Sequence, residues 1–145
     1  MDPRASALVD QLRLEPHPEG GYFREIFRSG RSVRPDDDRP SRAAVTTIYF
    51  LLVAGQQSRW HCVRSDEIWH FYEGDPLELS VSPPARERVD LLTLGPLSGA
   101  RRPVHVVPAR WWQTARPLGA YTLVGCTVAP GFDFADFSFP QDREA

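Results

Sequence analysis

The residues best suited to chemistry lie in one stretch, Gly55 to Pro76, which reads GQQSRWHCVRSDEIWHFYEGDP. Residues 60–63 form one short extended run, and residues 67–72 form a second run rich in β-forming side chains. The polar residues between them predict a turn. Two strands joined in this way would bring His61 close to Glu67. An imidazole and a carboxylate at that range can bind a metal ion or share a proton.

The surrounding sequence predicts an all-β protein with one short N-terminal helix. Asp2-Pro3 has the pattern of a helix cap and first turn, which predicts a helix over residues 3–13. About nine short strands follow at regular spacing, separated by Gly and Pro turns, as in a β-sandwich or small barrel. The clearest strands cover residues 22–28, 43–53, 77–82, 89–94, 104–107 and 120–128. A chain of 145 residues is expected to form one domain, residues 1–145.

Composition limits the function classes. A net charge of −2 gives no reason to expect a nucleic-acid partner or an anionic membrane surface. No apolar run has the length of a membrane span, and the first residues lack a signal-peptide pattern, so we expect a cytoplasmic protein. Cys62 and Cys126 lie in apolar runs and are expected to be reduced core residues.

Two further segments have distinctive compositions. Residues 29–42 carry the charged string RPDDDRPSR, which is typical of a solvated and mobile surface loop. Near the end of the chain, PGFDFADFSFP alternates Phe with polar residues. We expect its aromatic rings to pack back onto the body of the protein.

The spacing around His61 resembles the first cupin motif, G-x5-H-x-H-x3-4-E-x6-G. Gly55, His61, Glu67 and Gly74 stand at the required positions, and Val63 replaces the second His. The second motif, G-x5-P-x-G-x2-H-x3-N, is matched less well. Its Pro is present, but its Gly and its His ligand are replaced; these positions are Pro108, Arg110 and Gln113.

Longer strings resemble one branch of uncharacterised cupins, cupin family five. They are HPEGGYFRE, IYFLL, WH-V-SDEIWHFY-GDPLEL and VGCTVAPGFDFADF, at residues 17–25, 48–52, 60–79 and 124–137. The resemblance implies the cupin double-stranded β-helix, which is a jelly-roll barrel, and a homodimer. In that fold His61 and Glu67 would face the interior.

Our first hypothesis is a metal-independent enzyme that epimerises or isomerises a sugar-like or other polar metabolite. His61 would be the base and Glu67 would orient its ring or raise its pKa. By analogy with cupin-fold sugar epimerases, a tyrosine would be the acid, and Tyr22, Tyr49 and Tyr72 are the candidates.

Two alternatives stay open beside this hypothesis. One is a non-catalytic cupin that holds a small ligand. The other is a metal-dependent enzyme in which His61, Glu67 and Gln113 bind Zn, Fe, Mn or Ni, although a neutral amide is a poor ligand and Val63 leaves the set incomplete.

Around the cavity we expect aromatic walls and cationic groups suited to a phosphorylated or carboxylated sugar. The tryptophans expected in the walls are Trp60, Trp69, Trp111 and Trp112. The predicted ligand-binding residues are Tyr22, Arg24, Arg59, Trp69, His70, Trp112 and Gln113. Strand alternation places His70 on the face opposite Glu67, so a structural role or a dimer contact is the alternative for His70.

Overall fold

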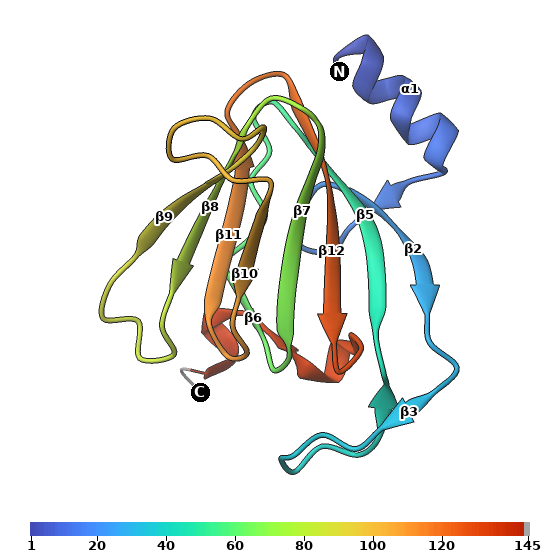
Figure 1. Cartoon of the computed structure of the whole chain (residues 1–145), viewed down its shortest axis with the longest axis vertical. Helices are drawn as coiled ribbons and strands as arrows, with labels where there is room; N and C mark the ends of the chain where they lie inside the picture. The colour runs from blue at the N-terminus through green and yellow to red at the C-terminus, as the bar shows by residue number, and fades with distance from the viewer. Residues whose placement is uncertain (144–145) are drawn as a thin grey trace.

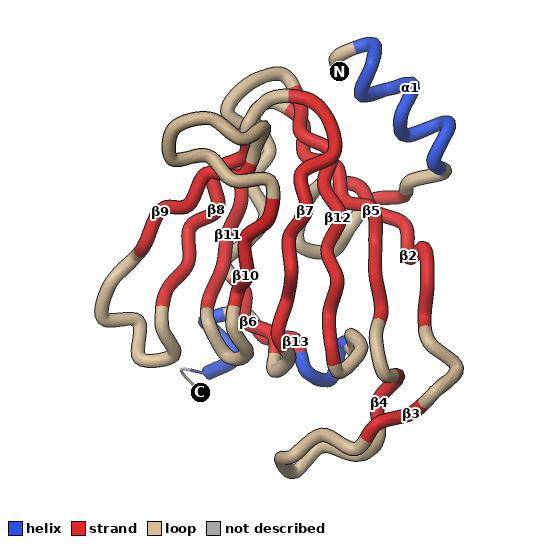
Figure 2. The backbone as a smooth tube through the Cα atoms, in the orientation of Figure 1, coloured by secondary structure: helices blue, strands red, loops and turns tan. Residues whose placement is uncertain are grey.

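Two antiparallel sheets face each other in this computed structural model, which describes residues 1–143 (Figure 1). The six-stranded sheet has the order β1 (Glu15–Pro16), β2 (Tyr22–Arg28), β5 (Thr46–Val53), β12 (Tyr121–Ala129), β7 (Asp66–Gly74) and β10 (Val104–Val107). The five-stranded sheet has the order β13 (Phe137–Ser138), β6 (His61–Val63), β11 (Trp112–Pro117), β8 (Leu77–Ser82) and β9 (Asp90–Leu94). The remaining elements are α1 (Pro3–Leu12), the hairpin β3 (Ser32–Val33) with β4 (Arg42–Ala43), and the 3₁₀ helices η1 (Phe134–Asp136) and η2 (Pro140–Arg143) (Figure 2).

The helix α1 begins where its sequence predicts. Asp2 caps it by accepting hydrogen bonds from the backbone N–H groups of Arg4 and Ala5, and Pro3 fills the first turn. Ala5 and Leu8 pack on the outer side of the six-stranded sheet against Leu51. The all-β class with a short N-terminal helix is therefore confirmed. No helix among the described residues combines the length and apolar character needed to cross a membrane.

The interior between the sheets is apolar over part of its length and polar at one end. Phe50 of β5, Trp69 of β7 and Val124 of β12 are buried in the main core. Further toward the start of β5, the inward positions change to Thr46 and Ile48, which line a cavity. Side-chain alternation along each strand therefore places the core and the cavity on the same inner face.

The segment that carries His61 and Glu67 does not form a hairpin, contrary to the sequence prediction. β6 pairs with β11 and β13 in one sheet, whereas β7 pairs with β12 and β10 in the other. The chain crosses between the sheets at Arg64 and Ser65. His61 and Glu67 therefore approach the interior from opposite sheets instead of lying side by side on one.

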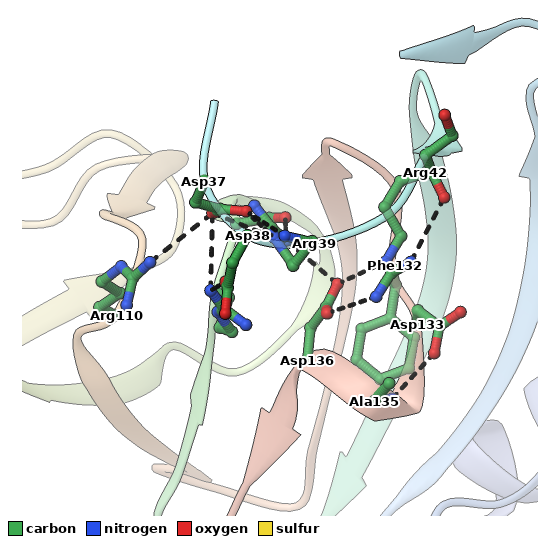
Figure 3. Close-up of polar contacts among 12 residues, drawn as sticks. Asp37, Asp38, Arg39, Arg42, Arg110, Phe132, Asp133, Ala135 and Asp136 are labelled. Atoms are coloured by element: carbon green, nitrogen blue, oxygen red, sulfur yellow. Dashed lines mark hydrogen bonds and ion pairs between the residues drawn. The ribbon is translucent and has the colours of Figure 1, made fainter. Parts of the chain in front are cut away.

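The charged loop before β5 is mostly exposed, as predicted, but ion pairs also tie it to the body of the protein (Figure 3). Arg39 is only 5% exposed, and its Nη1 donates to Asp136 Oδ2 at 3.0 Å and to Ser65 Oγ at 2.9 Å. Arg42 Nη2 donates to Asp136 Oδ1 at 2.8 Å. These contacts join the loop to the β6–β7 crossing and to η1, so they fix the C-terminal segment against the sheets.

We predict that Asp136→Asn destabilises the protein, because it leaves two arginines facing a neutral group at a buried site. Removing one partner of a buried ion pair typically costs about 3 kcal/mol or more. We expect a loss of this size in the free energy of unfolding of Asp136→Asn, measured by urea titration. Asp90→Asn, which breaks the exposed pair with Arg88, should cost less than about 1 kcal/mol. Equal small losses in both variants would contradict a structural role for Asp136.

The same cluster predicts an acid-sensitive contribution to stability. Burial acts to raise the pKa of Asp136, but hydrogen bonds from Arg42 and Arg39 outweigh it and hold that pKa below its usual value. A lowered folded-state pKa means that the contribution is complete above the ordinary carboxyl pKa and is lost as the pH falls through the lowered value. The stability difference between wild type and Asp136→Asn should therefore shrink in acid.

Candidate active site

A cavity of about 290 Å³ lies between the two sheets and the C-terminal segment. Its polar lining consists of His17, Glu19, Glu25, Arg28, Thr46, His61, Glu67, Cys126 and Asp133. Its apolar lining consists of Phe23, Ile48, Val63, Val128, Phe132, Phe134 and Phe137. Carboxylates and phenyl rings therefore dominate the space that a ligand would meet.

The turn before β2 places two of these polar groups. Gly20 and Gly21 have φ values of 106° and 82°, which side chains with a Cβ rarely adopt. A Cβ on Gly21 would lie 2.8 Å from the carbonyl oxygen of Leu51, so the turn also needs glycine to approach β5. This path carries Glu19 into the interior, where it is buried.

The His61 ring is hydrogen-bonded at both nitrogens. Its Nδ1 lies 2.7 Å from the carbonyl oxygen of Arg59, and its Nε2 lies 2.8 Å from Oε2 of Glu19. A carbonyl oxygen only accepts, so Nδ1 must carry a hydrogen. Glu19 and Nε2 then need one further proton between them, held either by an imidazolium or by a carboxylic acid. His61 and Glu19 therefore share a proton.

The surroundings favour the charged form of this pair. Burial acts to lower the pKa of His61, which is 2% exposed, but the Glu19 carboxylate outweighs burial and leaves the pKa above its usual value. The ring also stacks on Phe137, with centroids 5.0 Å apart and an interplanar angle of 17°. His61 is therefore set to hold a proton, and the role of a free base predicted from the sequence does not match this geometry.

Glu67 is oriented by a chain of donors. Trp69 Nε1–H can only donate, and it does so to Oε1 of Gln113 at 3.0 Å. The amide nitrogen of Gln113 must then face Glu67, and it donates to Oε1 of that residue at 2.8 Å. Burial raises the pKa of Glu67 above its usual value, and the nearby His61 opposes that rise. Its carboxylate is therefore a stronger base than an exposed glutamate.

His17, which also lines the cavity, holds the backbone of Glu19 in place. Burial lowers its pKa, and Nδ1 accepts a hydrogen bond from the backbone N–H of Glu19 at 3.0 Å. Its ring meets Phe23 and Phe50 edge-on, with centroid separations of 4.6 and 5.5 Å. A neutral His17 thus fixes the backbone that presents Glu19.

The sequence located His61 and Glu67 but missed the partner of the imidazole. Both residues line the cavity, yet the carboxylate that is hydrogen-bonded to His61 belongs to Glu19. The string HPEGG, with two adjacent glycines, was the signal that could have identified His17 and Glu19.

The predicted tyrosine acid has no counterpart in the cavity, because no tyrosine is among its described lining residues. Tyr49 and Tyr72 contact each other with centroids 6.2 Å apart, and Tyr72 is 51% exposed. Tyr22 and Tyr49 pack with the cluster beneath α1. All three therefore lie on the outer side of the six-stranded sheet.

The predicted cationic residues lie outside the cavity as well. Arg24 is exposed and alternates with Phe23 and Glu25, whose side chains do line the cavity. The Arg59 guanidinium stacks on Phe139 at 3.5 Å from the ring centroid, and only its backbone oxygen reaches His61.

The remaining predicted residues also lie behind or away from the lining. Trp69 is buried in the core, and Gln113 is buried between Trp69 and Glu67. Trp112 lines a separate hollow together with Trp60. His70 stacks with Tyr72, with centroids 6.4 Å apart, which agrees with the outward alternative for His70. Phenylalanines, and not the expected tryptophans, form the aromatic wall.

The donor set does not fit the metal site outlined from the sequence. Within residues 1–143 no group of three His, Cys, Asp or Glu side chains is placed to hold a metal ion. Gln113 turns its NH₂ group, which cannot ligate, toward Glu67, and both nitrogens of His61 are engaged.

Comparison with known proteins places the chain in a structural context. Residues 6–140 match the family model described as Cupin superfamily (DUF985). No curated protein matches the chain.

Several solved structures are similar to it. A hypothetical protein from Leishmania major is 32% identical, with a TM-score of 0.87, covering 92% of this chain and 85% of that one. A protein from Shewanella oneidensis is 35% identical, with a TM-score of 0.84, covering 97% and 87%. Oxalate decarboxylase from Bacillus subtilis is 12% identical, with a TM-score of 0.64, covering 89% and 30%, and this likeness concerns the jelly-roll fold alone.

We predict that Glu19→Gln lowers the pKa of His61 relative to the wild type, because the variant removes the carboxylate that most strongly opposes the effect of burial. Titration of the ring by NMR measures this change.

In the wild type the pKa of His61 is raised, so the charged ring stabilises the fold below the ordinary His pKa. That contribution is lost as the pH rises through the raised value.

Glu25→Gln is the matched control, since Glu25 lines the same cavity but pairs with Arg28. It should leave the His61 titration close to that of the wild type. An unchanged His61 pKa in Glu19→Gln would contradict the shared proton.

Proposed function

Because this chain belongs to the Cupin superfamily (DUF985), we propose that it is a small-molecule-binding cupin that epimerises or isomerises a polar metabolite by proton transfer. One observation carries the proposal: the proton-sharing pair His61–Glu19 and the buried carboxyl of Glu67 line the same cavity. Acid–base catalysis needs a group that gives a proton and a group that takes one, with environments that separate their roles.

The environments support distinct roles for the two groups. Glu67, made more basic by burial and oriented by Gln113, would remove a proton from a carbon of the substrate. His61 and Glu19 hold the proton that would be delivered to the product, either at an oxygen or on the opposite face of the same carbon. The donated proton and the abstracted proton balance, so the reaction needs no oxidant or reductant.

A non-catalytic ligand-binding cupin is the second candidate. The observation in its favour is that both ring nitrogens of His61 already have protein partners. In an enzyme, the substrate would have to compete with Glu19 for the shared proton. In a non-catalytic binding protein, the His61–Glu19 pair would only connect the glycine turn to β6.

Deuterium exchange tests the enzyme proposal without a known substrate. Neutral sugars and amino sugars are incubated with the protein in D₂O, and NMR follows deuterium uptake at carbon. We expect uptake into one class of compound and a loss of at least about 10²-fold in His61→Gln, the scale of a general acid–base contribution.

Tyr72→Phe is the control and should exchange at the wild-type rate, because Tyr72 is on the outer face. Ligand binding without deuterium uptake would reject the enzyme proposal and favour the non-catalytic ligand-binding cupin. A slower deuterium exchange in Tyr72→Phe would instead support a tyrosine as the catalytic acid.

We also propose a homodimer, formed through the outer face of the six-stranded sheet. Val104 and Val106 of the edge strand β10 are exposed and pair in register with His70 and Ile68. Together with exposed Tyr72 they make an apolar surface on one side of the sheet.

Light scattering should give twice the monomer mass of 16.4 kDa for the wild type and the monomer mass for Val106→Glu. Leu97→Glu, at an exposed loop position away from this face, should keep the dimer mass. A wild-type monomer would refute the proposal.

A further inference from the structure

We infer that the cavity selects a small organic cation, held at its mouth by Phe132 and Phe134 together with Asp133. This inference rests on the proposed function in one respect, that a ligand enters this cavity, and it names the chemical class of that ligand. The phenylalanine-rich C-terminal segment, whose role the sequence left open, supplies the site.

The three rings contact one another edge-to-face and form the aromatic end of the cavity. The Phe132 and Phe134 centroids are 4.9 Å apart at 84°. Phe137 lies 6.1 Å from each of them, at 77° and 64°. All three rings line the cavity, and Phe134 is 56% exposed to solvent. The faces of such rings carry the negative end of a quadrupole and attract a cation within about 6 Å.

The same segment already holds cationic side chains on its rings. His61 stacks on Phe137, and the Arg59 guanidinium lies 3.5 Å from the centroid of Phe139. In the part of the chain that the structure describes, no arginine or lysine lies over Phe132 or Phe134. These two rings are therefore the ones left to meet a cation from solution.

The charges of the lining favour the same ligand. Arg28 is paired through both carboxylate oxygens of Glu25, at 2.7 and 3.1 Å, and also donates to the carbonyl oxygen of Phe132 at 3.0 Å. His61 is paired with Glu19. Four carboxyl side chains line the cavity against two cationic ones, Arg28 and His61, so acidic groups are in excess.

Asp133 is the acidic group at the mouth of the cavity. It is exposed, and its Oδ1 caps η1 by accepting from the backbone N–H of Ala135 at 2.8 Å (Figure 3). An anionic ligand would meet the excess of carboxyl groups in the lining, and Arg24 and Arg59 are not in the cavity to offset it. A cationic ligand is therefore the alternative to the phosphorylated or carboxylated sugar predicted from the sequence, and the test below includes an anion to compare them.

The segment is also rigid enough to act as a preformed site. β13 pairs with β6, placing Phe137 opposite Val63. Asp136, directly before Phe137, is anchored by Arg39 and Arg42. A site that is ordered before binding loses less conformational entropy when a ligand enters.

The test uses a pair of probes with the same shape, choline and its uncharged isostere 3,3-dimethylbutan-1-ol, with oxalate as the anion. Titrations followed by NMR give each affinity. We expect choline to bind at least about fivefold more tightly than the isostere, the scale of one cation–π contact, and oxalate to bind more weakly than both. Added salt should weaken choline binding and leave the isostere unaffected.

Variants assign the effect to the site. Phe134→Leu keeps an apolar side chain without the ring, and Asp133→Asn keeps the capping oxygen without the charge. Each should weaken choline binding about threefold or more and leave the isostere unchanged. Leu91→Ala, on the exposed edge strand β9, is the matched control and should not change choline affinity.

Equal affinities for choline and its isostere, a preference for oxalate, or the absence of choline binding would each overturn the cation assignment. The proposed function has a separate readout. Deuterium uptake into a neutral sugar that depends on His61, without any preference for choline, would reject the cation and keep proton transfer. Selective choline binding without exchange would keep the cation and reject catalysis.

Discussion

The hydrogen bond between His61 and Glu19 is the interaction on which the site depends. It joins the glycine turn before β2 to β6, and so connects the two sheets across the interior. Both side chains are buried, where an unpaired charge would be costly, so each requires the other. Because Nδ1 donates to the Arg59 carbonyl, one further proton lies between Nε2 and Glu19, and in the proposed function this is the proton given to the substrate.

The other parts of the molecule place groups around this pair. Trp69, on the same strand as Glu67, and Gln113, on β11 of the facing sheet, orient the Glu67 carboxylate. The cluster centred on Asp136 fixes the C-terminal segment so that Phe137 covers the His61 ring. Elements distant in sequence thus supply a proton donor, a basic carboxyl and an aromatic wall to a single space. That combination supports proton transfer on a ligand more directly than it supports a purely structural role.

Much of the fold could be predicted from local signals. The cap at Asp2, the alternation along β8 and the turn glycines mark where elements begin and end. The cupin spacing correctly brought His61 and Glu67 into one interior. These features depend on residues close together in the chain, which is where propensity and periodicity carry information.

The rest of the site depends on long-range packing. Alternation shows that Tyr72 and Trp69 point to opposite faces, but not how much of the inner face is core and how much is cavity. The contact of Glu19 with His61 requires positive φ values at two glycines and the docking of distant strands. The burial of Arg39 likewise depends on Asp136, near the other end of the chain. A composition that is typical of a solvated loop carries no information about such a partner.

Neutron diffraction from a crystal grown at neutral pH would test the central claim most directly, because it locates hydrogen atoms. The account predicts one hydrogen on Nδ1 of His61 directed at the Arg59 carbonyl, and a second between Nε2 and Oε2 of Glu19. A ring with a bare Nδ1, or an empty position between Nε2 and Glu19, would contradict it.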